Sequence, residues 1–133
     1  MKQNLMLTIA SLLSILFGMF HLADDIDRGM SPGGLPNLLA VVICVVWLYG
    51  TLVLAERRSG YVIILVASLL LMGVPVIHMR GAGVGFGTTR SGGVLFIWTL
   101  LAMGVTALFS VILSVRGLWS LPWRRSRQSN IQT

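Results

Sequence analysis

Charged residues are scarce in this sequence of 133 residues, where they make up 11% of the chain while 56% of it is apolar. In soluble domains about a quarter of all residues are charged, so this composition argues against a water-soluble globular fold. Only four residues are acidic, against ten Lys or Arg, which gives a formal net charge of +6. The basic residues flank apolar segments, so we expect membrane lipid, and no nucleic acid, as the partner of this positive charge.

Cysteine and recognisable catalytic patterns are also scarce. The single cysteine, Cys44, falls inside an apolar segment, so no internal disulfide can form. No serine stands in a nucleophile-elbow pattern, and no cysteine and histidine are expected at one depth. The glycines that alternate between positions 81 and 87 do not match a dinucleotide-binding motif. We therefore expect a protein that is not an enzyme.

Long apolar segments dominate the chain instead. Four of them contain no Asp, Glu, Lys or Arg, namely residues 5–23, 38–55, 61–77 and 94–115. Each approaches the roughly 20 residues that cross a hydrocarbon core of about 30 Å. Backbone groups find no partners in lipid, so such segments form helices. The sequence predicts an all-α integral membrane four-helix bundle in one domain, 1–123, followed by a basic polar tail, 124–133.

The first apolar segment could also be a signal peptide, because Lys2 precedes it. No small-residue cleavage motif follows the segment, so we expect it to be retained as a helix.

The distribution of Lys and Arg predicts the orientation of this bundle. With four crossings, seven of these residues fall on one side: Lys2, Arg57, Arg58, Arg116, Arg124, Arg125 and Arg127. Three fall on the other side: Arg28, Arg80 and Arg90. Cytoplasmic loops are enriched in Lys and Arg, so both termini are expected in the cytoplasm. The short chain and this simple asymmetry favour a bacterial or archaeal plasma membrane.

Aromatic and basic residues meet near the end of the last apolar segment. Trp119 and Trp123 stand beside Arg124 and Arg125. Tryptophan and basic side chains gather at membrane–water interfaces. We expect these four residues to anchor the chain at the lipid interface.

Small and polar residues recur at helical spacing in several segments. Ser11, Ser14, Gly18, His21 and Asp25 follow alternating steps of three and four, which places them on one face of a helix. We expect this face to point into the bundle rather than at lipid. Comparable stripes occupy two other segments: Ala40, Cys44, Thr51 and Ala55, and Ala102, Thr106, Ser110 and Ser114. Such stripes favour close helix packing, within the bundle or in a homo-oligomer.

Both histidines of the chain are expected at the outer ends of their helices. His21 lies within one turn of Asp24 and Asp25, and His78 ends the third apolar segment. Imidazole and carboxylate ligands suit divalent Zn, Fe, Mn or Cu. His21, Asp24, Asp25 and His78 are therefore candidate metal ligands. Two facing histidines could alternatively hold haem b.

A simpler interpretation of the acidic residues is that they form only ion pairs. Asp24 and Asp25 precede Arg28 by four and three residues, which suits salt bridges within one helix. The two outer loops also carry opposite net charge. We therefore expect Asp24, Asp25 or Asp27 to pair with Arg80 or Arg90 across the loops, each exposed pair contributing at most about 1 kcal/mol.

Two functional hypotheses follow from these features. The first is a non-enzymatic membrane protein that acts as a binding or accessory subunit through its extracytoplasmic loops, as a homo-oligomer or within a larger membrane complex. The second is a metal- or haem-binding redox or transport protein with its site on His21 and His78. The presence or absence of a bound metal separates the two.

Overall fold

The computed structural model describes residues 2–29, 31, 34–80 and 93–121. These residues form four helices: α1 (Lys2–Asp27), α2 (Leu35–Leu52), α3 (Arg58–Arg80) and α4 (Gly93–Ser120). Each helix is long and apolar enough to cross a membrane. The prediction of an all-helical chain with four such helices is confirmed.

Two helix ends differ from the predicted ones, and that of α1 matters for the site. α1 continues one turn beyond Ala23, through the acidic residues, and its end is followed by Gly29 with φ +66°. A glycine in this left-handed conformation is a common helix terminator. α2 ends at Leu52, so Ala55 lies in the connection to α3 and is exposed. Asp24, Asp25 and Asp27 therefore all lie on α1.

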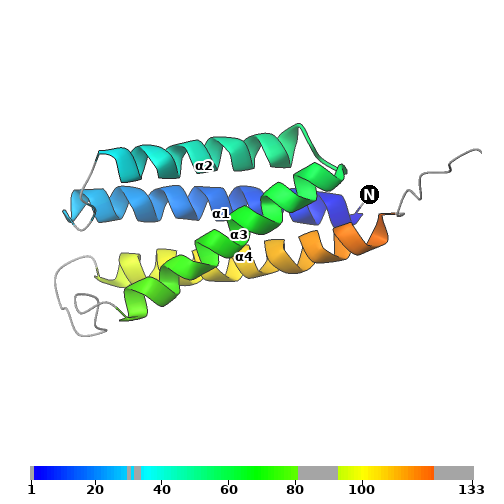
Figure 1. Ribbon diagram of the computed structural model, residues 1–133. Helices are drawn as coiled ribbons and strands as arrows, with labels where there is room; N and C mark the ends of the chain where they lie inside the picture. Colours follow the sequence, from blue (N-terminus) through cyan, green and yellow to red (C-terminus); the bar gives the residue numbers. More distant parts are fainter. Residues whose placement is uncertain (1, 30, 32–33, 81–92, 122–133) are drawn as a thin grey trace, which may run out of the picture.

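The helices form a bundle in which α3 crosses the others diagonally (Figure 1). α3 begins beside the C-terminal end of α2 and ends beside the start of α4. α1 and α3 both pack mainly against α4, whereas α2 has no close backbone contact with α4 among the described residues. The last turns of α1 and α3 and the first turns of α2 and α4 share one end of the bundle, which we call the site end.

A cluster of buried apolar side chains lies toward the opposite end of the bundle. Its core comprises Leu7, Trp47, Tyr61, Ile64, Ala67 and Leu113. Within it the indole Nε1–H of Trp47 donates to Ser11 Oγ at 2.7 Å, and Ser11 Oγ lies 2.7 Å from Thr51 Oγ1. A side chain at Gly117 would overlap the Tyr61 ring, so glycine allows α3 and α4 to approach closely.

The small polar face of α1 points inward as predicted. Ser11 and Ser14 are both 0% exposed, and the Leu71 side chain packs over Gly18. In α4, Ser110 and Ser114 are also fully buried. Small residues thus line the helix contacts, which is typical of helix packing in membranes.

The outer surface of the bundle is largely apolar. Its exposed large side chains include Leu39, Val45, Leu70, Trp98 and Trp119. An apolar surface this extensive is far larger than a soluble monomer exposes, and together with the four long apolar helices it indicates a multi-pass membrane protein. Of the predicted interfacial anchors, Trp119 is 84% exposed at the end of α4, and Trp123, Arg124 and Arg125 lie outside the described residues.

Candidate metal centre

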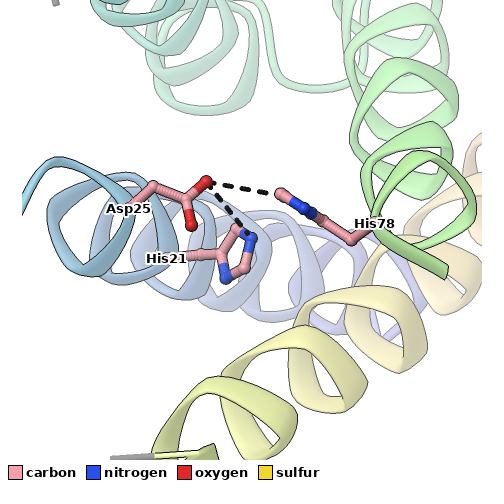
Figure 2. Close-up of side chains that lie close together, drawn as sticks. All are labelled: His21, Asp25 and His78. Atoms are coloured by element: carbon pink, nitrogen blue, oxygen red, sulfur yellow. Dashed lines mark ion pairs between the residues drawn. The ribbon is translucent and has the colours of Figure 1, made fainter. Parts of the chain in front are cut away.

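Three polar side chains from two helices meet at the site end of the bundle. α1 supplies His21 and Asp25, which stand one helical turn apart, and α3 supplies His78 (Figure 2). These side chains meet because both helices continue far enough along the bundle. α1 runs on to Asp27, which brings Asp25 over His21, and α3 runs through Pro75 to Arg80, which carries His78 to the same depth.

The three side chains point their polar atoms at one another. Asp25 Oδ2 lies 3.7 Å from His21 Nε2 and 3.5 Å from His78 Nε2. One donor atom from each of the three residues can be chosen so that all lie within 4.8 Å of one another. Ligand atoms around a tetrahedral ion with bonds of 2.0–2.2 Å are about 3.4 Å apart. The two oxygen-to-nitrogen distances are close to this spacing, so the cluster is near the size that one metal ion requires.

Burial leaves this cluster with unmet hydrogen-bonding capacity. His21 is 3% exposed, yet neither of its ring nitrogens has a hydrogen-bond partner in the described part of the chain. Asp25 Oδ1 is also buried without a partner. Buried polar groups nearly always have one, so each such exception requires an explanation. An ion held between these residues would give one of the His21 ring nitrogens a partner.

An aromatic ring from a third helix closes the cluster on one side. The Phe96 ring of α4 lies with its centroid 5.0 Å from that of His21 and 5.6 Å from that of His78. The Arg28 guanidinium lies over the same ring, with its Cζ 5.5 Å from the Phe96 ring centroid. Sequence reasoning did not include Phe96, although its place in the first turn of α4 puts it at the same end of the bundle as the histidines.

The fourth predicted ligand, Asp24, takes a different role. Its Oδ2 accepts a hydrogen bond from Arg28 Nε at 2.8 Å. This is the salt bridge expected from the spacing of four residues, and the structure therefore divides the two neighbouring acids between an ion pair and the histidine cluster. Asp27 is exposed. The side chains of Arg80 and Arg90 lie outside those described, so the ion pairs across the loops stay a prediction.

The two imidazole rings leave no slot for a macrocycle between them. They are in direct edge-to-face contact, with centroids 4.9 Å apart and an interplanar angle of 78°. Bis-histidine haem ligation needs one imidazole on each face of the macrocycle. This arrangement suits a single ion better than haem b.

A cavity of about 250 Å³ opens beside the cluster. His21 and Asp25 form part of its wall, and it extends along α1 as far as Trp47 of α2. Most of the remaining wall is aliphatic. A metal at the cluster would therefore have apolar space on one side.

No known protein-family model matches this chain, and neither the curated proteins nor the solved structures compared with it give a significant match.

Proposed function

We propose that this protein is an integral membrane metal-binding protein that holds a divalent transition metal between His21, Asp25 and His78. The observation that carries this proposal is the single carboxylate oxygen at 3.7 and 3.5 Å from two imidazole nitrogens, one of them on a buried ring that makes no hydrogen bond to the described residues. The first hypothesis, an accessory subunit that binds through its outer loops, stays a prediction beside it.

The donor set favours a transition metal with an open coordination position. Two imidazoles and one carboxylate suit Zn²⁺ and Fe²⁺, whereas Mg²⁺ and Ca²⁺ prefer oxygen ligands alone. Structural zinc sites usually have four protein ligands, and sites that bind a further molecule have three. Three ligands therefore fit a centre that exchanges a ligand or passes the metal on, as in redox or transport proteins.

The same proposal includes an orientation in the membrane. Seven Lys and Arg residues flank the helices on the side of the termini, and three flank them on the site side. By the positive-inside rule the termini face the cytoplasm and the site end faces outward. A centre at this end would take its metal from outside a plasma membrane.

Metal titration with matched variants tests the proposal. The protein is purified in lipid nanodiscs, stripped with chelator and titrated with Zn²⁺ by calorimetry, with metal content measured by elemental analysis. We expect one ion per chain. His21→Ala, His78→Ala and Asp25→Asn should each weaken binding by at least about tenfold, because each removes one of three ligands.

Asp24→Asn is the matched control, since Asp24 is an acid of the same helix turn that pairs with Arg28 instead. Its affinity for Zn²⁺ should stay within about threefold of the parent, allowing for the loss of a nearby charge. Absence of Zn²⁺ binding by the parent, or equal losses in Asp24→Asn and Asp25→Asn, would reject the proposed site.

A further inference from the structure

The cavity beside the histidine cluster is a cleft with polar groups at one end only. Its polar end is formed by His21 and Asp25, and its far end by Trp47. Between them the wall is made of aliphatic, sulfur-containing and glycine residues: Gly18, Met19, Leu22, Ala40, Ile43, Cys44, Ala67, Leu70, Leu71, Val74 and Met103. This distribution of polarity is that of a binding site for a molecule with a polar head and an apolar tail.

The cleft follows from the way the helices diverge. A short connection holds α2 and α3 together at one end, and α3 then crosses toward α4 while α2 stays beside α1 (Figure 1). Ala40 and Cys44 of α2 and Gly18 of α1 are too small to fill the space that this divergence leaves. Leu70 lines the cleft and is 58% exposed, so the cleft is open at this apolar side chain rather than sealed inside the bundle.

Charge decides which head group fits. A divalent ion bound by the carboxylate of Asp25 leaves one net positive charge, since neutral imidazoles add none. The neighbouring Asp24 is already paired with Arg28 and does not balance that charge. An uncompensated charge in low-dielectric surroundings is unfavourable, so the open coordination position favours an anionic oxygen ligand over a neutral one.

Resting on the proposed metal site, we propose that this cleft binds a single-chain fatty acid whose carboxylate coordinates the metal and whose tail lies between α1, α2 and α3 toward Trp47. The ligand enters sideways from the bilayer past Leu70. The metal site then binds a membrane amphiphile, and the fatty-acid carboxylate completes the coordination of the metal.

Cobalt spectroscopy can test both halves of this inference. The protein is loaded with Co²⁺ in phosphatidylcholine nanodiscs, where the visible absorption of the ion reports its ligands. Dodecanoate is titrated as a mole fraction of lipid, and 1-dodecanol, with the same tail and a neutral head, serves as the comparison. We expect dodecanoate to change the Co²⁺ spectrum saturably and dodecanol to leave it unchanged.

A variant that fills the cleft tests the position of the tail. Ala40→Trp occupies the cleft from α2 without altering a ligand, and Leu39→Trp places the same side chain on the exposed neighbouring position. Ala40→Trp should raise the half-saturating dodecanoate fraction by at least about tenfold, because the tail would clash with the indole. Leu39→Trp should leave it unchanged. Ile43→Trp, one turn further along the cleft, repeats the test if Ala40→Trp fails to give the parent Co²⁺ spectrum.

The outcomes separate this inference from the metal site itself. A parent protein that binds no Co²⁺ overturns both. Normal Co²⁺ binding with no spectral response to dodecanoate, or with an equal response to dodecanol, overturns the fatty-acid ligand and leaves the metal site standing. A response that Ala40→Trp and Ile43→Trp fail to weaken shows that the carboxylate binds without the cleft and overturns the placement of the tail.

Discussion

Replacing His21 with leucine is expected to stabilise the metal-free protein while it abolishes metal binding. The imidazole is 3% exposed, and neither ring nitrogen has a hydrogen-bond partner in the described structure. A buried polar group without a partner costs about 1–3 kcal/mol, whereas leucine fills a similar volume without polar atoms. The His21→Leu variant should therefore raise the free energy of unfolding of the metal-free protein by up to about 1–3 kcal/mol.

Metal should reverse this order of stability. A ligand that binds only the folded state adds about 2.7 kcal/mol when present at about 100 times its dissociation constant. The parent gains this stabilisation in Zn²⁺, and the variant gains none of it. The measurement is reversible unfolding in mixed micelles at increasing fractions of sodium dodecyl sulfate, followed by tryptophan fluorescence, with chelator and with Zn²⁺.

His78→Leu provides the comparison, because the His78 side chain is 18% exposed and can already reach solvent. Its removal should stabilise the metal-free protein less than removal of His21 does. If His21→Leu instead lowers the metal-free stability by more than about 1 kcal/mol, the ring is satisfied in the native bundle, and the reasoning from its missing partners is wrong.

Three further predictions concern the core and the pH dependence of the site. Ser11→Ala should lower the free energy of unfolding by about 1–3 kcal/mol, because it leaves the Trp47 indole N–H without its acceptor. Ser14→Ala should cost less in the same unfolding assay, because the Ser14 hydroxyl donates to Ala10 O of its own helix and lies a longer 3.4 Å from Ser110 Oγ of α4. Gly117→Ala should destabilise the bundle by about 1–3 kcal/mol, because the new methyl group overlaps the Tyr61 ring; an unchanged unfolding midpoint would contradict this contact. Zn²⁺ affinity should fall as the pH is lowered, since protons compete with the metal for the imidazole nitrogens, and an affinity that does not change across the acidic range would exclude histidine ligands.

The helices could be predicted because their apolar segments contain no charge for the length of a membrane crossing. Their ends could not be predicted as well, since hydropathy marks where charge begins and not where the helix ends. α1 is the example, because it continues past its predicted end at residue 23 through Asp24, Asp25 and Asp27. Its termination depends on backbone conformation at Gly29, which adopts a positive φ. That glycine was a readable signal of the true helix end.

The part of the site that lies on a single helix was predictable from the sequence. His21 and Asp25 stand four residues apart on one helix, so their proximity follows from helix geometry once α1 is known to continue. The same geometry separates Asp24 from the cluster, because successive residues of a helix point about 100° apart. The inward stripe that begins at Ser11 includes Asp25 and excludes Asp24, so the sequence held the information that distinguishes the two acids.

The contribution of α3 and α4 depended on tertiary packing. The depth of His78 followed from the length of its apolar segment, but the side of α3 on which it points depends on how that helix crosses the bundle. Phe96 belongs to a helix whose start was predicted within one residue, at Val94, and yet its contact with both imidazoles depends on the rotation of α4. Neither rotation is encoded in hydropathy alone.

A direct histidine–aspartate ion pair is the alternative explanation of the same cluster, and the nitrogen-to-oxygen distances show how close such a pair is. Charge-assisted hydrogen bonds between a protonated imidazole and a carboxylate are about 2.7–2.9 Å long. Both nitrogen-to-oxygen distances exceed this, at 3.7 and 3.5 Å. Asp24 and Arg28, one position away on the same helix, do reach 2.8 Å. α1 therefore forms a close ion pair on one side and only loose carboxylate–imidazole contacts on the other, and these contacts are close to the roughly 3.4 Å between two ligands of one tetrahedral ion.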